Sequence, residues 1–311
     1  MTLVTERFHF ASAPDSWGVL DYPGPSWNQS YEKMLDEMVQ AGYTGTELGP
    51  YGFFPTDPVV LRPQLEKRSL KLLGSFVPVI LSDPASEGIA VEQIRRVGNL
   101  LSTLKAPFLV LADAQSPERD RISGRVPEDG SRSWKAEQWT NVKKVVEEAA
   151  HVASEFGLDL VFHPHVATYV ETPREIERFF DVTSHTGIGL CLDTGHSLYG
   201  AGDPVAEAEK YRGILRFIHI KDCDEKLLED ARRKGLTFDQ AIEEKVFTII
   251  GRGSIDFAAF FRVLQKNSYS GWMVVEQDVK FGATAVPPAQ SIAASLRYLR
   301  GVVTALGASN R

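Results

Sequence analysis

The segment LCLDTGH, residues 190–196, decides how this chain folds. A short apolar run ends at Asp193, and His196 follows three residues later. We interpret the run as a buried strand that carries an acid and an imidazole to one open end. The same form recurs in LVFHPH (160–165), FIHIKD (217–222) and MVVEQD (273–278). Four strand ends with metal-binding or acid–base side chains indicate one site assembled from distant parts of the sequence.

Strand-like and helix-like segments alternate along the chain. We interpret eight apolar runs as strands, at residues 8–14, 45–48, 71–80, 107–113, 158–165, 188–196, 214–222 and 271–278. Each is followed by a helix-capping residue or by apolar residues at helical spacing. This alternation predicts a parallel sheet, and eight such units close into a barrel with its site at the C-terminal strand ends. We therefore predict an α/β fold, a (β/α)8 TIM barrel, as a single domain over residues 1–311. An open doubly wound sheet is the weaker alternative, because the sequence has no GxGxxG turn.

Composition narrows the class of protein. The 311 residues are 43% hydrophobic, which is enough for a sizeable core. The net charge is -7 and the basic residues are scattered, so we expect no nucleic-acid partner. Cys191 and Cys223 are the only cysteines in the sequence, and they form neither a metal-ligand pair nor a disulfide framework. With no signal peptide pattern and no apolar stretch of membrane-spanning length, we expect a cytoplasmic protein with no membrane partner.

The strand ends offer ligands for a divalent metal ion. Carboxylates and imidazoles bind such ions. The candidates, one from each of strands five to eight, are His163 or His165, Asp193, His219 and Glu276. A mixed nitrogen and oxygen set without thiolate favours Mn, Co, Fe or Zn over a structural zinc. The alternative is that each is an ordinary polar group at a strand end, which is less convincing for four together than for one.

Three further residues are candidates for catalysis. His163 and His165 face the same way on a strand, so one can bind metal while the other acts as a base or contacts substrate. Lys221 could stabilise an enolate, or be an ordinary salt-bridged lysine. Glu47, at the end of the second strand, could act as an acid or base, clamp a hydroxyl group, or form a plain ion pair.

The remaining candidates would contact substrate at the mouth of the barrel. His196 is placed on the turn that leaves the sixth strand, where it could contact substrate or a second metal ion. Asp222 flanks the same mouth, and Arg252 lies on a Gly-rich turn that could bind an oxyanion. Asp15 and Trp17 would line the rim, because aromatic and polar side chains together suit sugar-like rings. For each, a purely structural role is the alternative.

Seven motifs, in order along nearly the whole chain, resemble the inosose dehydratase group of the xylose isomerase-like barrels. They are APDSWG (13–18), GTELGPYGFFP (45–55), HPHVATYVETPREI (163–176), LCLDTGH (190–196), HIKD (219–222), FTIIGRGSIDF (247–257) and GWMVVEQD (271–278).

The resemblance implies a metal site. The usual ligands of these barrels are Glu, Asp, His and Glu on strands five to eight, and Asp193, His219 and Glu276 match three of them. His163 stands where most relatives have Glu, although the inosose dehydratases have a similar histidine cluster. The resemblance also implies a divalent ion, with Mn favoured, a base at His165 and a substrate contact at His196.

The resemblance further implies a reaction on a keto-polyol or keto-sugar. The metal would polarise the carbonyl, His165 or Glu47 would remove the α-proton, and Lys221 would stabilise the enolate. A second group, such as His196, would protonate the departing hydroxyl. The alternatives are a ketose epimerase or isomerase, a 3-oxo-glycoside eliminase with a small partner subunit, and a non-catalytic sugar-binding barrel. A homo-oligomer stays open, and the negative net charge argues against the superfamily's DNA-cleaving activity.

Overall fold

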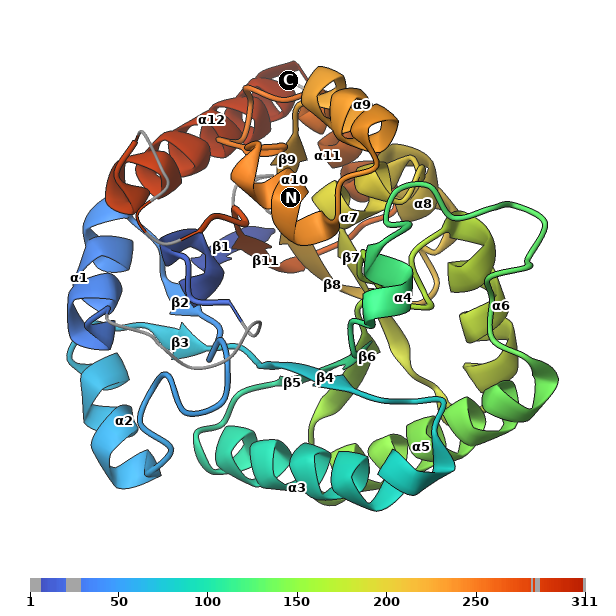
Figure 1. Cartoon of the computed structure of the whole chain (residues 1–311). Helices are drawn as coiled ribbons and strands as arrows, with labels where there is room; N and C mark the ends of the chain where they lie inside the picture. The colour runs from blue at the N-terminus through green and yellow to red at the C-terminus, as the bar shows by residue number, and fades with distance from the viewer. Residues whose placement is uncertain (1–6, 21–28, 281, 283–285, 310–311) are drawn as a thin grey trace.

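Parallel strands form a ring that helices surround (Figure 1). The computed structural model describes residues 7–20, 29–280, 282 and 286–309. The strands of the main sheet are β1 (Phe8–Ser12), β2 (Gly45–Thr46), β3 (Lys71–Leu72), β4 (Phe76–Val79), β5 (Phe108–Asp113), β6 (Asp159–Phe162), β7 (Gly189–Asp193), β8 (Leu215–Ile220) and β11 (Gly271–Val275). They lie in the order β3-β2-β1-β11-β8-β7-β6-β5-β4. The pairs within this sheet are parallel, which confirms the predicted barrel topology.

The predicted third strand, residues 71–80, is broken into β3 and β4. β3 pairs with β2, whereas β4 pairs with β5, so this one stretch of chain changes partner and closes the ring. Gly74 lies in the break, where a Cβ atom would stand 2.8 Å from the carbonyl oxygen of Phe108. The backbone N–H of Phe108 donates to the carbonyl of Leu73 at 2.9 Å, which ties the break to β5.

The outer helices follow the strands in the predicted alternation. They are α1 (Tyr31–Ala41), α2 (Pro58–Glu66), α3 (Glu87–Thr103), α5 (Ala136–Glu155), α6 (Pro173–Thr183), α8 (Pro204–Lys210), α11 (Phe257–Lys266) and α12 (Pro288–Ser309). Most begin after a residue whose side chain caps the helix, such as Ser30 before α1 and Thr172 before α6.

Most strands end a few residues earlier than predicted, and for two of them this changes the position of site residues. β6 ends at Phe162, so His163 and His165 lie in the segment beyond it. β7 ends at Asp193, and the short helix α7 (Thr194–Tyr199) begins at once. The carboxylate of Asp193 caps this helix by accepting the N–H groups of Gly195 and His196, both at 2.8 Å. His196 is therefore a helical residue and does not lie on an exit turn as expected.

The interior of the barrel explains why the polar residues converge. A buried apolar cluster inside the ring includes Val161, Cys191, Phe217 and Val274, each on a different strand. Side chains two residues apart on a strand point to the same side. The residues two positions further along are His163, Asp193, His219 and Glu276. The same alternation that fills the barrel with apolar groups thus aims these four side chains inward at its C-terminal end.

Two excursions lie at this end of the strands. Residues 114–134 contain α4 (Pro117–Asp120), and residues 223–246 contain α9 (Glu225–Lys234) and α10 (Phe238–Glu243). An antiparallel pair, β9 (Asp222–Cys223) and β10 (Phe247–Thr248), brackets the second excursion. A second apolar cluster, which includes Phe238 and Phe247, packs this excursion onto α7.

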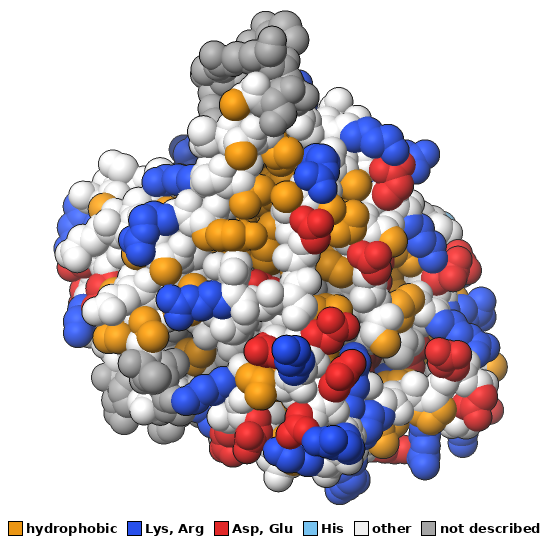
Figure 2. Space-filling model, turned by 90° about the horizontal axis from the view of Figure 1, so that it is seen from above, with side chains coloured by type: hydrophobic (Ala, Val, Ile, Leu, Met, Phe, Trp, Pro, Cys, Tyr) orange, Lys and Arg blue, Asp and Glu red, His pale blue; other side chains and the backbone are white. Residues whose placement is uncertain are grey.

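The surface carries charges of both signs. On the face shown in Figure 2, Lys and Arg side chains are interspersed with Asp and Glu. Within the described ranges, no helix is both long and apolar enough to cross a membrane.

Candidate active site

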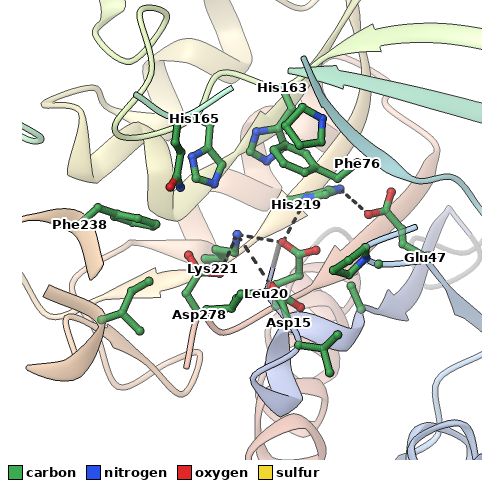
Figure 3. A pocket seen from close by; sticks show the side chains of 18 of the residues that line it. Asp15, Leu20, Glu47, Phe76, His163, His165, His219, Lys221, Phe238 and Asp278 are labelled. Carbon is green, nitrogen blue, oxygen red and sulfur yellow. Dashed lines mark ion pairs between the residues drawn. The ribbon is translucent and has the colours of Figure 1, made fainter. Parts of the chain in front are cut away.

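A cavity of about 270 Å³ opens at the C-terminal ends of the strands. Its lining includes Asp15 after β1, Glu47 after β2, His163 and His165 after β6, His219 on β8, Lys221 after β8, and Glu276 and Asp278 after β11. Phe76 of β4 and Phe238 of α10 complete it with aromatic rings, and Figure 3 shows these side chains turned toward one another. The structure therefore brings together residues as distant in the sequence as Asp15 and Asp278.

Lys221 lies at the centre of this group. Its ammonium nitrogen stands 3.0 Å from Glu276, 3.1 Å from Asp278 and 3.2 Å from Asp193. Asp15 is further away, at 3.9 Å. Burial opposes a charge on this side chain, but the surrounding carboxylates outweigh burial and hold the pKa of Lys221 well above its usual range. Lys221 is thus a buried cation at the floor of the cavity.

The end of β7 positions Lys221. The hydroxyl of Thr194 donates to the carbonyl of Lys221 at 2.6 Å and accepts its N–H at 3.0 Å. Gly195 follows, and a Cβ atom there would stand only 2.5 Å from the Cβ of Lys221. The DTG part of the opening motif therefore caps α7, fixes the end of β8 and leaves room for the lysine.

His219 joins two carboxylates across the barrel. Its Nδ1 lies 3.1 Å from Glu276, and its Nε2 lies 3.4 Å from Glu47. Burial lowers the pKa of His219, but Cys191, Glu276 and Glu47 raise it more, so the pKa lies well above its usual value. The pKa of Glu276 is lowered to about 2, because His219 and Lys221 outweigh its burial. The two acids thus favour a positive charge at this position, and a metal ion bound by His219 would take the place of the ring proton.

The predicted metal ligands fall into overlapping groups and do not form one set of four. Among the described residues, ligand atoms lie within 4.8 Å of one another in the groups Glu47–His219–Glu276, His163–Asp193–His196 and His163–Cys191–His219. His163 Nε2 is 3.4 Å from Asp193. Lys221 lies between the Asp193 and Glu276 carboxylates. Glu47, expected from sequence to act on protons or hydroxyls, belongs geometrically with the ligand atoms.

The chemistry of these groups fits a divalent ion. Two buried ligand atoms, Glu47 Oε1 and His163 Nδ1, have no hydrogen-bond partner within the described part of the chain. Asp193 Oδ2 and His219 Nε2 also make no hydrogen bond, but they lie within ion-pair distance of Lys221 and Glu47, at 3.2 and 3.4 Å. A buried polar atom without a partner is costly, and a bound cation would satisfy such atoms. Oxygen and imidazole nitrogen atoms are also the ligands that Mn, Fe, Co and Zn accept.

His165 presents a free ring nitrogen to the cavity. Its Nδ1 lies 2.7 Å from the carbonyl oxygen of Val166, which can only accept. Nδ1 therefore carries the hydrogen, and Nε2 keeps its lone pair. Burial, with the charges of His163 and Lys221, lowers the pKa of His165 to about 3, so the ring is neutral near pH 7. The Nε2 lone pair is therefore available to a bound molecule.

His196 lies behind the cavity. It is buried, its ring centroid is 3.9 Å from that of His165, and its Nε2 is 3.2 Å from the ammonium of Lys221. His196 is not among the described residues that line the cavity. His196 therefore supports His165 and Lys221, whereas the sequence suggested direct contact with substrate.

Three other residues that the sequence suggested as substrate contacts also lie outside the described lining of the cavity. The Asp222 carboxylate accepts the N–H groups of Gly251 and Gly253, at 2.8 and 2.9 Å, and so holds the Gly-rich turn. Arg252 is exposed on that turn. Trp17 is buried, and its indole N–H donates to Glu37 at 2.6 Å. Asp222 and Trp17 thus make structural contacts, and Arg252 lies on the surface. Asp15 lines the cavity, as expected.

Among the cavity-lining residues that the sequence interpretation missed are Phe76, Asp113, Phe238 and Asp278. Asp278 stands two residues after Glu276, and the alternation along the strand could have identified it. Asp113 ends β5; burial raises its pKa to about 7 although it accepts the N–H of Tyr169. Phe238 comes from the charged excursion, which gave no sign that one of its rings reaches the site.

Comparisons with known proteins agree with this architecture. The model of the xylose isomerase-like TIM barrel family matches residues 35–302. The inosose dehydratase of Geobacillus kaustophilus (strain HTA426) is 32% identical over 279 residues, covering 89% of this chain and 90% of the relative. The rhizopine catabolism protein MocC of Rhizobium meliloti is 34% identical over 265 residues, covering 85% of this chain and 80% of the relative.

Solved structures share the fold at low sequence identity. IolI protein, in a crystal structure with a zinc atom, superposes with a TM-score of 0.70 at 16% identity, covering 95% of this chain and 98% of that one. The 3-keto-D-glucoside 4-epimerase YcjR from E. coli gives 0.68 at 16% identity, covering 95% and 99%. The barrel, the family match and the identity to full-length relatives lead to one conclusion: this chain belongs to the xylose isomerase-like TIM barrel family.

Proposed function

We propose that the protein is a metal-dependent lyase that removes water from a keto-polyol of the 2-keto-myo-inositol (inosose) type. One observation carries the proposal: His165, with Nε2 free, faces the same small cavity as the Lys221 ammonium and the carboxylate and histidine ligand atoms. The inosose dehydratases to which this chain aligns, over nearly the full length of both, support the class of substrate. A cavity of about 270 Å³ suits a single sugar-sized ring.

Glu47, His219 and Glu276 would hold the metal ion, with Asp193 and His163 beside them. This set is rich in carboxylates, which favours Mn, although its imidazole suits Zn as well; the IolI structure is described as binding zinc. When bound, the ion would supply Lewis acidity to the substrate carbonyl. The buried ligand atoms that lack hydrogen-bond partners support this placement.

The chain's own residues divide the proton transfers. His165 Nε2 takes the proton from the carbon next to the carbonyl, and the electron pair moves to the carbonyl oxygen. Lys221 donates a hydrogen bond to that oxygen and stabilises its charge. The enolate then expels the β-hydroxyl group, a carbon–carbon double bond forms, and a proton from the protein completes the departing water.

Asp15 is the residue that fits this last role. It lines the cavity, and burial together with the charge of Glu276 holds its pKa well above the usual range, so it keeps a proton that it can donate. The N–H of Ser16 donates to its Oδ1 at 2.7 Å, which leaves Oδ2 for the substrate. His196, the acid suggested by the sequence, lies behind Lys221 instead.

A substrate panel tests the proposal. The protein is stripped with chelator, reloaded separately with Mn, Co, Fe or Zn, and offered 2-keto-myo-inositol, ketohexoses and 3-oxo-glycosides. The proposal expects a dione from 2-keto-myo-inositol, formed only by reloaded protein. Reversible interconversion of ketoses without loss of water would replace it with an epimerase, and release of an aglycone would replace it with an eliminase. Binding of these compounds without turnover would indicate a non-catalytic sugar-binding barrel.

A further inference from the structure

A second, smaller cavity lies behind His196. It has a volume of about 10 Å³ and is bounded by residues of α7, α8 and the ends of β6 and β7. Its lining includes Glu207, Tyr211, Ser197 and His196. All of its lining residues are buried. It shares Asp193 and His196 with the active-site cluster but is separate from the substrate cavity.

Polar atoms without partners line this rear cavity. Both carboxylate oxygens of Glu207 and Nδ1 of His196 are buried with no hydrogen-bond partner of good geometry in the described part of the chain. The Ser197 hydroxyl lies beside Glu207 and lowers the pKa of its carboxyl group, though less than burial raises it. Glu207 is 6% exposed and His196 3%. An apolar cavity of this size can stay empty, but a polar one with several donors and acceptors is where proteins hold ordered water. The volume is about that required by one water molecule.

The tautomer of His196 also supports an ordered water molecule in this cavity. The ammonium of Lys221 carries only donors, and it lies 3.2 Å from Nε2 of His196. Asp278 Oδ2 lies further from Nε2, at 3.7 Å, so we assign Nε2 as the acceptor from Lys221 and place the ring hydrogen on Nδ1. That Nδ1–H is buried and has no partner in the described chain, and His196 lines the rear cavity. A buried ring nitrogen and a buried carboxyl group, neither with a hydrogen-bond partner in the described chain, thus belong to residues that line one cavity with room for about one water molecule.

We propose that the rear cavity binds one ordered water molecule, which accepts the Nδ1–H of His196 and links it to Glu207. Glu207 then acts as a positioning residue: through the water it holds His196 in the tautomer that accepts from Lys221. Burial also raises the pKa of Glu207 to about 7, which lets the carboxyl group keep a proton and both donate and accept near neutrality. The water site stands without any assigned reaction, while its effect on turnover rests on the function proposed above.

Gly202 offers a second way to probe this site. A Cβ atom at this position would stand 2.4 Å from Glu207 Oε1 and 2.8 Å from the Ser197 hydroxyl. A Gly202→Ala variant therefore pushes a methyl group against the carboxyl group without removing it. Glu209 lies on the same helix, bonds to Lys266 at 3.0 Å at the surface, and provides a matched control.

The test is a crystal structure of the metal-loaded enzyme at a resolution that shows ordered water, with Glu207→Gln, Glu207→Leu, Gly202→Ala and Glu209→Gln for comparison. We expect one density peak within hydrogen-bond distance of His196 Nδ1 and Glu207 in the wild type, Glu207→Gln and Glu209→Gln. We expect it to be lost or displaced in Glu207→Leu and Gly202→Ala. A dry cavity in the wild type overturns the proposal, whatever the enzyme's substrate.

Kinetics and spectroscopy separate positioning from mere packing. In ¹⁵N-histidine spectra of zinc-loaded protein, His196 should be the Nδ1–H tautomer in the wild type and Glu207→Gln, and a mixture in Glu207→Leu. The kcat of Glu207→Leu should fall about tenfold with little change in KM, a size typical of a partner one step removed from the reacting groups, and Glu207→Gln should restore most of it. An unchanged tautomer and kcat in a folded Glu207→Leu protein contradict the positioning role. A protein with the water in place but no turnover of inosose refutes the proposed function alone.

Discussion

The ammonium nitrogen of Lys221 lies 3.2 Å from Nε2 of His196, so a buried cation donates to a neutral ring. The same ammonium is held by Glu276, Asp278 and Asp193. Under the proposed function, this ammonium is a preorganised donor for the substrate oxygen that gains charge. Such donors act strongly in a site that excludes water.

Replacement of this lysine tests its role. Lys221→Met should lower kcat by about 10² to 10³, the range seen when one stabilising donor is removed from a developing oxyanion. Steady-state kinetics with 2-keto-myo-inositol measure the effect, and the exposed Lys226→Met on α9 is the control. If Lys221→Met folds and turns over as fast as the control, Lys221 does not stabilise the enolate.

The two main groups of ligand atoms can be told apart by single substitutions. Glu47→Gln removes a charged oxygen from the Glu47–His219–Glu276 group. We expect it to weaken metal affinity at least about 10²-fold, more than the effect of losing a second-layer partner. His163→Gln should have a smaller effect, and the exposed Glu66→Gln should have none. Calorimetric titration of stripped protein with Mn or Zn measures all three. The reverse order of effects would move the ion to His163, Asp193 and His196.

Stability as a function of pH tests the burial of Glu207. Its pKa in the folded protein is raised to about 7 by burial, so between its unfolded value and that value the fold retains a proton that the unfolded chain releases. The carboxyl group therefore destabilises the fold increasingly as pH rises from about 4.5 to above 7. Glu207→Gln should match the wild type near pH 4.5 and exceed it by about 2–3 kcal/mol at pH 8. Denaturant unfolding of metal-free protein measures this, with Glu209→Gln as control; an equal difference at both pH values would contradict it.

A buried ion pair holds the first excursion to the barrel. Arg119 of α4 donates to both oxygens of Glu175 on α6, at 2.7 and 2.9 Å, and both side chains are buried. Arg119→Met should lower the free energy of unfolding by about 3–5 kcal/mol, because it leaves a buried carboxylate unpaired. Adding Glu175→Gln should recover part of that loss.

The exposed pair of Arg95 and Glu155 is the control for this effect. Arg95→Met should cost less than about 1 kcal/mol, as surface ion pairs usually do. Unfolding by denaturant compares the three proteins. Equal losses in Arg119→Met and Arg95→Met would show that the buried pair does not fasten the excursion.

Much of the fold and the composition of the site could be predicted from local pattern. Alternation along the strands predicts that His163, Asp193, His219 and Glu276 converge, because each follows an interior apolar residue by two positions. The barrel topology likewise follows from strands alternating with helices, and it is confirmed.

What the pattern could not predict depends on distances between different strands. Lys221 lies between two of the expected metal ligands because of the stagger of β7, β8 and β11. No local spacing in the sequence predicts this stagger. The placement of His196 behind the cavity follows from α7 starting at once after Asp193. Phe238 reaches the cavity only because its excursion folds back over the barrel, which no periodicity in that charged segment indicates.

The most direct test of the central claim is the reaction of metal-loaded protein with 2-keto-myo-inositol in D₂O, with His165→Gln and the exposed His151→Gln compared side by side. Mass spectrometry follows dione formation and deuterium uptake at the carbon next to the carbonyl. We predict that the wild type and His151→Gln form the dione, and that His165→Gln loses both dione formation and exchange while it still binds metal. Dione formation by His165→Gln at the wild-type rate would contradict the account.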